Sequence, residues 1–263
     1  MTACVLLSCG ERSKPSGGSE STAPAVSEAL LREFPLLPMA EPQRWSRLLE
    51  AEAERPATEE SRERVESLAE ELRRLHPFST DDEGMELGGI RFDAESATFR
   101  RPARVRYPDE GDERHPGELE LLLCSGQGRV HETLFECDLR PLHLELLLHL
   151  AGYRKESEPA TFGIRVVAPL GESIPVRELV RRMDAREWSG RLEWEFSGSK
   201  FGDLYAPDLS GDFAIFWHAH DSVLRVRDEA IGTGELKLRA IRHPALPNGS
   251  EVVLEMKATG RSQ

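Results

Sequence analysis

From residue 88 onward the sequence is a series of short strand-like runs separated by turn residues. In one of them Leu192, Trp194 and Phe196 alternate with glutamates, a pattern typical of a strand with one face in water. The sequence has no strand–helix–strand rhythm and no glycine-rich phosphate loop, which disfavours a doubly wound nucleotide-binding fold. We therefore predict an α+β fold whose sheet is mainly antiparallel. The predicted strands are 90–93, 97–99, 105–107, 118–124, 130–137, 162–168, 190–196, 212–217, 222–227, 235–241 and 251–258.

One helix within this region stands out, RPLHLELLLHLAG at residues 140–152. Pro141 suits the first helical position and Gly152 suits the C-terminal cap. Leucines cover nearly every side of the segment, so we expect the helix to be buried. A shorter helix is predicted from Val176 to Met183.

The segment before the strands, 39–80, is predicted to form a helical hairpin. Its first helix spans about 42–54 and is ended by Pro56, and its second begins near Thr58, a plausible N-cap. The hairpin packs on the main domain or on itself, since it has too few heptads for a convincing coiled coil. The apolar positions of the second helix are Val65, Leu68, Leu72 and Leu75. The predicted parts of the chain are a tether (1–38), this helical segment (39–80) and an α+β domain (81–263).

The charge of the chain argues against one class of partner, nucleic acids. The chain has 263 residues and a formal net charge of −13. A nucleic-acid-binding protein would show a basic stripe, and we find none, so no nucleic-acid partner is expected. No apolar run reaches the length of about 18 residues that would suggest a membrane-spanning helix.

The N-terminus resembles a bacterial lipobox, the motif in which a cysteine is lipidated after signal-peptide cleavage. LLSC at residues 6–9 matches this motif, and residues 10–25 are rich in Ser, Gly and Pro, which suits a flexible tether. We therefore predict a bacterial envelope protein, anchored on the periplasmic side of a membrane through Cys9. The apolar run that leads up to Cys9, residues 3–7, is shorter than that of a secretory signal, and no Lys or Arg comes before it. A start upstream of Met1 would supply the rest; if the motif is a chance match, the protein is cytoplasmic.

Several sequence segments together resemble the YdjY-domain family. The most specific is ELELLLCSGQGRVHETLFECDLRPLHLELLLHLAG, residues 118–152, with a cysteine near a strand end, a glycine turn, His-Glu-Thr and a leucine-rich helix. RLEWEFSGSKF, YAPDLSGDFAIF and LPNGSEVVLEM are weaker likenesses, so the resemblance covers roughly 88–258. WHAHD, residues 217–221, departs from the family pattern. The family is largely uncharacterised, and its many envelope lipoproteins agree with the predicted anchor.

Some proteins of that family are labelled as iron–sulfur or ferredoxin-like. This chain has only Cys4, Cys9, Cys124 and Cys137, and none of them form a Cys-x-x-Cys pair. Iron–sulfur clusters need several closely spaced thiolates. We therefore expect no iron–sulfur cluster, and we leave a bound metal open.

The motif GRVHETLFEC, residues 128–137, holds the first candidate site. It is predicted as the second strand of an antiparallel hairpin whose turn is SGQGR, residues 125–129. In that register His131 points inward beside Leu123 and Glu132 points outward, so the pair could share a metal only across a bulge. We interpret His131 as a buried hydrogen-bonding residue that fixes the hairpin. Ligand or metal binding and acid–base catalysis are the alternatives.

The same register separates the two cysteines of the hairpin. Cys124 and Cys137 would lie on opposite faces and several residues apart, which is too far for a disulfide. Both are predicted to be free and partly buried. Redox sensing through Cys124 is a third hypothesis, and its leucine-rich flank argues against it.

HAHD, residues 218–221, is the second candidate site. A His-x-His pattern on a strand puts His218 and His220 on one face, which is a spacing used in metal sites. A third ligand would be needed, such as His131 or Asp212. The alternative is a pair of half-exposed histidines near a strand end.

Two functions follow from these patterns. The favoured one is a non-catalytic envelope lipoprotein that binds an unknown protein or small molecule. The alternative is a metal-dependent enzyme that uses His131, Glu132, His218 and His220, and it requires these residues to meet in one polar pocket. Whether the protein is an enzyme stays open at the level of the sequence.

Overall fold

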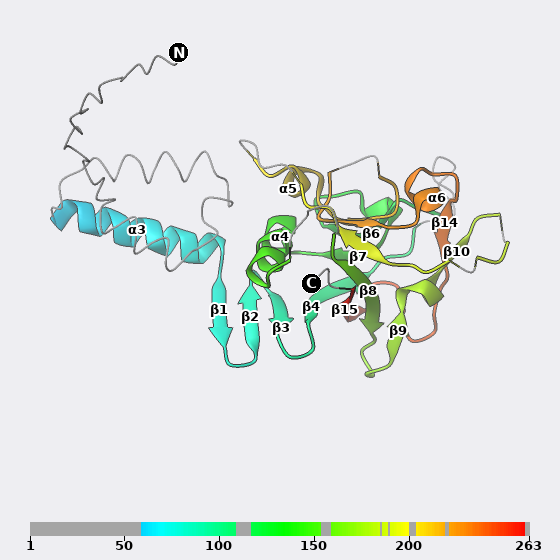
Figure 1. The fold of residues 1–263 in the computed structure, drawn as a ribbon, viewed down its shortest axis with the longest axis horizontal. Coiled ribbons are helices and arrows are strands. Elements are labelled where there is room, and N and C mark those ends of the chain that lie inside the picture. Colours follow the sequence, from blue (N-terminus) through cyan, green and yellow to red (C-terminus); the bar gives the residue numbers. More distant parts are fainter. Residues whose placement is uncertain are drawn as a thin grey trace, which may run out of the picture.

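The computed structural model describes residues 59–108, 117–153, 159–184, 186–188, 190–199, 204–218 and 221–260. Its strands form two sheets, one of twelve strands and one of three. Helix α3 (Glu59–Leu75) extends from one end of the body that these sheets form (Figure 1). The predicted tether with Cys9 and the first predicted helix, 42–54, lie outside the described residues.

Eight strands of the large sheet close into a barrel. In ring order they are β4 (Thr98–Val105), β15 (Glu251–Gly260), β8 (Thr161–Val167), β11 (Trp194–Phe196), β13 (Leu224–Val226), β12 (Asp212–Ile215), β6 (Leu121–Ser125) and β7 (Thr133–Cys137). The pairing of β7 with β4 completes the ring. Closure gives every barrel strand a neighbour on both sides, so these strands present no unpaired edge.

The remaining strands lie outside the ring. β1 (Phe78–Asp81), β2 (Gly84–Leu87) and β3 (Ile90–Asp93) extend the sheet beyond β4 as successive antiparallel strands, and β9 (Ser173–Pro175) pairs with β8. The second sheet joins β10 (Val180–Arg182), β14 (Leu238–Ala240) and β5 (Glu118–Leu119), all antiparallel. β10 and β14 lie at the end of the molecule away from α3 (Figure 1).

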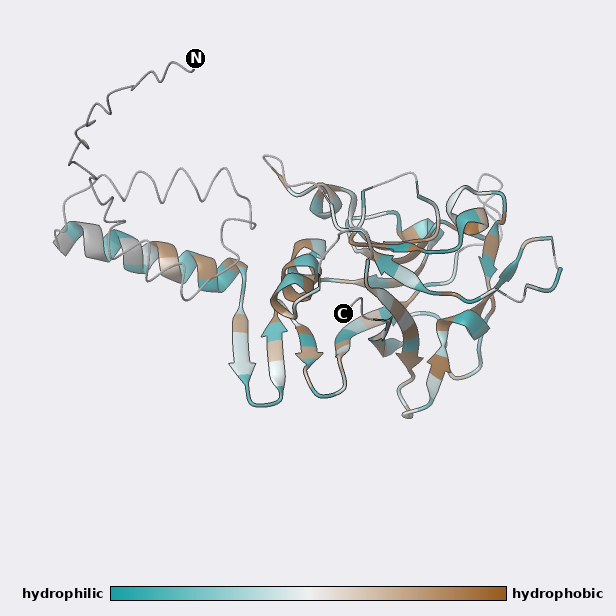
Figure 2. Cartoon of the chain, in the orientation of Figure 1, coloured by the Kyte–Doolittle hydropathy of each residue, from teal (hydrophilic) through white to brown (hydrophobic). Residues whose placement is uncertain are grey.

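The helices are short except for α3. α4 (Pro141–Leu150) begins with Pro141 at its first turn and contacts β2, β3 and β12, and Gly152 after it has a φ of 87°. α4 is coloured mainly as hydrophobic, whereas α3 carries both colours (Figure 2). The predicted helices at 58–75 and 140–152 are thus confirmed in α3 and α4. The segment predicted as a helix from Val176 to Met183 is instead a 3₁₀ turn, Val176–Leu179, followed by β10. The other α-helices of the described ranges are α5 (Ala206–Ser210) and α6 (Glu229–Gly232).

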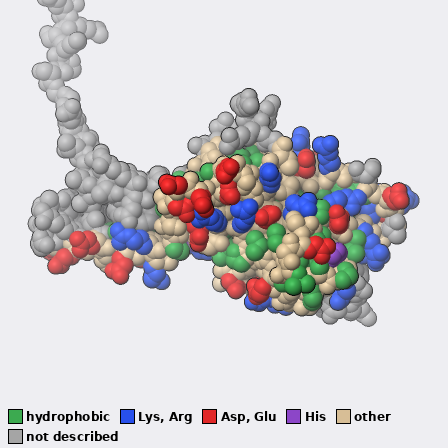
Figure 3. All heavy atoms as spheres, turned by 90° about the horizontal axis from the view of Figure 1, so that it is seen from below, with side chains coloured by type: hydrophobic (Ala, Val, Ile, Leu, Met, Phe, Trp, Pro, Cys, Tyr) green, Lys and Arg blue, Asp and Glu red, His purple; other side chains and the backbone are tan. Residues whose placement is uncertain are grey.

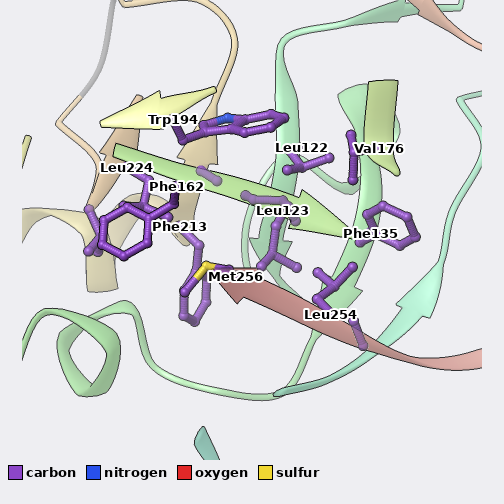
Figure 4. Packing of buried hydrophobic residues seen from close by; sticks show 14 of the residues in the cluster. Leu122, Leu123, Phe135, Phe162, Val176, Trp194, Phe213, Leu224, Leu254 and Met256 are labelled. Atoms are coloured by element: carbon purple, nitrogen blue, oxygen red, sulfur yellow. The ribbon is translucent and has the colours of Figure 1, made fainter. Parts of the chain in front are cut away.

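Large apolar side chains from several strands fill the core. Phe135, Phe162 and Trp194 are completely buried and lie near Phe213 and Leu254 in the same cluster (Figure 4). A barrel of eight strands has an interior just wide enough for side chains to fill. The barrel is therefore a packed scaffold, and recognition is expected on its outer surface.

The predicted α+β class is wrong, because the protein is mainly β: a closed eight-stranded barrel with additional strands and short helices. The leucine-rich helix is buried as expected, but its ten residues do not make a second layer. Strand periodicity shows which side chains face a core. It does not show whether the two ends of a sheet pair with each other, so closure was not predicted.

The predicted hairpin at 118–137 is also wrong. β6 and β7 are neighbours, but they run parallel, with Leu121 opposite Thr133 and Ser125 opposite Cys137. The connection between them, residues 126–132, must therefore run back along β6 before β7 begins. Parallel neighbours usually need a connection of about a dozen residues or more, so this one is unusually short.

Candidate functional site

The connection at 126–132 carries the His-Glu motif. Its last residues, Val130–Glu132, form a 3₁₀ turn and not a strand. The alternation of faces expected from a strand is therefore lost. The side chain of His131 is 54% exposed, and that of Glu132 is 5% exposed. The prediction that His131 points inward and Glu132 outward is wrong.

Arg129 lies among three carboxylates, of which Glu132 belongs to this connection. Its Nη1 donates to Glu120 and, at 3.0 Å, to Glu132, and its Nη2 lies 3.7 Å from Asp212. His131 Nε2 lies 3.4 Å from the other carboxylate oxygen of Glu132. A guanidinium keeps its charge and offers a fork of donors, so one arginine can compensate several carboxylates that leave water. The glutamate of the motif thus belongs to an ion-pair network that fastens the connection to β12.

Two glycines allow the connection to lie directly on its neighbours. Gly211 has a φ of 79° and accepts a hydrogen bond of 2.8 Å from the backbone N–H of Ser125. A Cβ on Gly211 would lie 2.9 Å from the Cα of Gly128, and a Cβ on Gly128 would lie 3.0 Å from the carbonyl oxygen of Ser210. Only glycine combines this backbone conformation with so close an approach.

His218 is engaged in contacts near its own strand. Its Nε2 lies 2.6 Å from the carbonyl oxygen of Val226, and its ring covers Gly232, where an added Cβ would come within 2.1 Å of the ring. These contacts fasten the segment after β12 to β13 and α6. His220 lies outside the described residues.

The described residues do not bring a set of metal ligands together. Within the part of the chain that the structure describes, no group of three or more His, Cys, Asp or Glu side chains is arranged to hold a metal ion. His131 contacts Glu132, and His218 contacts a backbone carbonyl. Each of these imidazoles therefore has a local structural role.

Cys124 and Cys137 are free, as predicted, and both are buried. The reason differs from the predicted one, because in the parallel register Cys124 lies opposite Glu136 and Cys137 lies opposite Ser125. Burial raises the pKa of the Cys124 thiol to about 12. Redox chemistry needs the thiolate, so this environment disfavours a redox-sensing role for Cys124.

Arg101 on β4 places a positive charge in the protein interior. No pattern in the sequence indicated that this arginine is buried. It is 1% exposed, its Nη2 lies 2.7 Å from the Sγ of Cys137, and its guanidinium stacks on the ring of Phe213 at 3.9 Å from the centroid. Burial lowers the pKa of Arg101, and the nearby Cys137 sulfur opposes this shift. The aromatic face and the sulfur partly replace the water that the guanidinium has lost.

A second buried polar group lies under α4. The carboxylate of Glu145 accepts hydrogen bonds from the Tyr205 hydroxyl and, at 3.0 Å, from the backbone N–H of Ser199, and it lies 3.6 Å from Nε2 of His149. Burial and the Glu145 carboxylate raise the pKa of Tyr205, so its hydroxyl keeps its proton and donates. The sequence signal for this group is a Glu and a His four positions apart on one leucine-rich helix.

A groove opens beside the three-stranded sheet, and we call it the arginine groove. It has a volume of about 590 Å³. Arg177 lies over the ring of Trp188 at 4.4 Å from its centroid and donates to the Trp188 carbonyl, while Arg182 bonds Asp184 at 2.8 Å. Lys and Arg side chains gather at the end of the molecule that carries β10 and β14 (Figure 3). The lining residues are Arg177, Glu178, Val180, Arg181, Arg182, Arg186, Glu187, Trp188, Gly190 and Ile241.

The sequence signal for the arginine groove is local. RELVRRMDAREWSGR, residues 177–191, holds five arginines and one tryptophan. A net charge of −13 averages over the whole chain and so conceals this cluster. The fold then adds Ile241, which directly follows β14, the strand paired with β10, and lies far away in the sequence.

A second groove, of about 600 Å³, lies at the turn after β6 and includes Glu136 and Asp208. Two of its three carboxylates have cationic partners, since Glu136 pairs with Arg106 and Asp208 lies 2.6 Å from Arg140. These pairs leave the second groove less charge to offer a ligand than the arginine groove has.

Comparison with known proteins does not identify a family for this chain. No protein-family model, no curated protein and no solved structure matches the chain. Among the described residues, no helix is both long enough and apolar enough to cross a membrane. The likeness to the YdjY-domain family stays a prediction from the motifs in the sequence.

Proposed function

We propose that this protein is a lipid-anchored, non-catalytic binding domain whose recognition surface is the arginine groove. The observation that carries the proposal is the groove itself, which places four arginines beside Trp188 in an otherwise acidic chain. Its volume of about 590 Å³ falls in the range of small-molecule sites. The closed barrel behind it supplies a rigid support, which a binding surface needs to keep its shape.

The contacts that the motif residues make favour a binding function over a catalytic one. His131, Glu132 and His218 take part in contacts that hold strand connections in place. A metal-dependent enzyme would need at least three protein ligands around one open coordination position. The described residues do not form such a set.

Support for the anchor comes from the lipobox-like LLSC at residues 6–9 and from the resemblance to a family rich in envelope lipoproteins. The anchor is tested by labelling cells with a fatty-acid analogue, with Cys4→Ala as the matched control for Cys9→Ala. Label is expected on the native chain and the Cys4→Ala variant and is expected to be lost from Cys9→Ala. Equal labelling of both variants would refute the anchor.

The binding function is tested with a panel of anionic, neutral and cationic small molecules in a thermal-shift assay. A true ligand raises the Tm in proportion to its affinity for the folded state. At least one compound is expected to stabilise the native chain and a Trp217→Ala variant, but not a Trp188→Ala variant. Trp217 is the control because it is 42% exposed and does not line the arginine groove. If no compound of any charge acts through Trp188, the proposed function fails.

A further inference from the structure

Two arginines on the outer face of the three-stranded sheet lie directly opposite each other. Arg181 on β10 pairs with Arg239 on β14 in the antiparallel register. Like charges in directly opposite positions repel each other and destabilise a sheet. An anion bound between the two guanidinium groups would remove this repulsion.

The neighbouring carboxylates do not neutralise this pair. Glu118 lies opposite Arg239 on the third strand, but its side chain bonds Lys237 at 2.9 Å. Arg181 forms no ion pair with a carboxylate among the described residues, and the Nε of Arg239 is buried without a hydrogen-bond partner there. Two positive charges and at least one unused donor therefore face the same side of the sheet.

The arginine pair lies next to the arginine groove. Arg181 and Ile241 both line the groove, and Ile241 directly follows β14, two residues after Arg239. Arg239, which is paired with Arg181, therefore lies at the border of the groove. Two carboxylates, Glu178 and Glu187, also line the groove. Asp184 pairs with two of the lining arginines, Arg182 and Arg186. The four lining arginines still outnumber these three carboxylates before Arg239 is added.

We propose that Arg181 and Arg239 bind the phosphate group of a phosphate monoester, with the rest of the molecule lying along the arginine groove toward Trp188. A phosphate monoester carries close to two negative charges at neutral pH and three oxygens that accept hydrogen bonds. Two arginine forks can each engage two of these oxygens, whereas a carboxylate would satisfy only one fork. Trp188 offers an apolar surface to the organic part of the ligand.

This inference rests on the proposed function and names its ligand class. The ligand could be a soluble metabolite or the headgroup of a lipid, since both can present the same phosphate monoester. The experiment uses the full chain with Cys9→Ser, so that no attached lipid contributes. The probes are inorganic phosphate, phenyl phosphate and vesicles with or without phosphatidic acid, and acetate at equal ionic strength is the control anion.

Calorimetry is expected to detect phenyl phosphate bound more tightly than acetate. The double variant Arg181→Gln/Arg239→Gln should bind it at least about tenfold more weakly, because both charged donors of the phosphate are removed. Arg91→Gln, which changes an exposed arginine of β3, should bind like the native chain. Trp188→Ala should weaken phenyl phosphate while inorganic phosphate is unaffected.

The stability of the double variant provides an independent readout. Because it removes a repulsive pair, it is expected to unfold at the same temperature as the native chain or at a higher one. A marked fall in its Tm would show that the arginines are structural and would overturn the proposal. Equal affinity of the native chain and the double variant for phenyl phosphate would overturn it as well.

Vesicle sedimentation distinguishes a lipid headgroup from a soluble ligand as the source of the phosphate group. Sedimentation with phosphatidic acid vesicles, but not with phosphatidylcholine vesicles, would identify a lipid headgroup; binding of phenyl phosphate alone would identify a soluble ligand. If a neutral compound binds through Trp188 and no phosphate does, the phosphate proposal fails and the binding function stands. If nothing binds through the groove, both fail.

Discussion

At the scale of single residues, Gly211 carries two separate constraints. Its φ of 79° lies in the left-handed region, and an added Cβ would lie 2.5 Å from the Ser125 hydroxyl oxygen and 2.9 Å from the backbone of Gly128. The left-handed region costs a residue with a Cβ about 1–2 kcal/mol. Backbone that must move to relieve overpacking costs about 1–3 kcal/mol more. Gly211→Ala is therefore expected to lower the free energy of unfolding by about 2–5 kcal/mol, measured by urea denaturation.

Gly171 is the matched control for this substitution. Its φ of 86° is similar, but nothing lies within 4 Å of an added Cβ. Gly171→Ala thus isolates the backbone term of about 1–2 kcal/mol. Equal losses at the two positions would show that the close crossing of the strand connections does not exist in solution.

The burial of His143 is expected to make the stability of the protein depend on pH. It lies on α4 in contact with the end of α3, where its Nε2 is 3.2 Å from the Nδ1 of His76 and 3.2 Å from the Leu75 carbonyl oxygen. Burial, together with His76 and Arg140, lowers the pKa of His143 to about 3. In the unfolded chain this histidine takes up a proton near pH 6.5. Between about pH 6.5 and pH 3 the unfolded state therefore holds the extra proton, and stability falls as the pH is lowered.

The quantity to measure is the slope of the free energy of unfolding against pH. One proton corresponds to up to about 1.4 kcal/mol per pH unit, so urea unfolding at pH 7, 5.5 and 4.5 resolves it. His143→Leu should flatten the slope by up to that amount. Leu147→Ala should lower stability and leave the slope as it is, because it only removes buried apolar atoms. The same slope in the native chain and in His143→Leu would contradict the assignment.

At the scale of elements, the connection between β6 and β7 depends on Arg129. The guanidinium of this residue lies 3.0 Å from the Glu132 carboxylate and 3.7 Å from the Asp212 carboxylate, and both carboxylates are buried. Arg129→Met keeps much of the apolar stem but takes the charge away from those carboxylates. Removing one partner of a buried ion pair typically costs about 3–5 kcal/mol. We expect a loss of that size in the free energy of unfolding by urea denaturation.

The exposed ion pair between Arg91 and Asp81 provides the comparison. It joins β3 to β1 at 3.1 Å, and its side chains are 33% and 54% exposed. Exposed pairs contribute about 0–1 kcal/mol, so Arg91→Met should change stability only slightly. If Arg129→Met were as mild as Arg91→Met, the network around Glu132 would not be a structural one.

The sequence predicted single elements better than it predicted their pairing. Leucine density and Pro141 identified α4, and helical spacing identified α3. The pairing of β6 with β7 was mistaken because a glycine-containing turn between two strands usually indicates a hairpin. Here the parallel register depends on Gly128 meeting Gly211, which lies far away in the sequence.

The same limit applied to the candidate sites. The exposures of His131 and Glu132 were reversed because the motif lies in a 3₁₀ turn, where strand alternation does not hold. The arginine groove was missed because its charge is a property of one short segment and of the strand that the fold places beside it. Spacing rules detect neighbours along one element, but they do not detect Arg181 facing Arg239 across two elements.

At the scale of the whole molecule, closure of the barrel governs access to its interior. Every barrel strand is paired on both sides, so no edge strand can peel away without breaking the ring. Cys124 is completely buried and Cys137 is 6% exposed. A reagent should therefore reach these thiols only when the barrel unfolds as a unit.

Thiol labelling tests this cooperativity directly. In a full chain with Cys4→Ser and Cys9→Ser, the disulfide reagent DTNB should react slowly with the native protein, because Cys124 and Cys137 are buried and burial raises the pKa of the Cys124 thiol to about 12. The rate should rise with urea in step with the unfolded fraction, since labelling follows the population of the open state when refolding is fast. Ser79→Cys on the exposed strand β1 supplies a thiol that should react at once in the same protein. Rapid labelling of Cys124 or Cys137 well below the unfolding transition would mean that the ring opens locally, and the arginine groove would then rest on a scaffold that is not rigid.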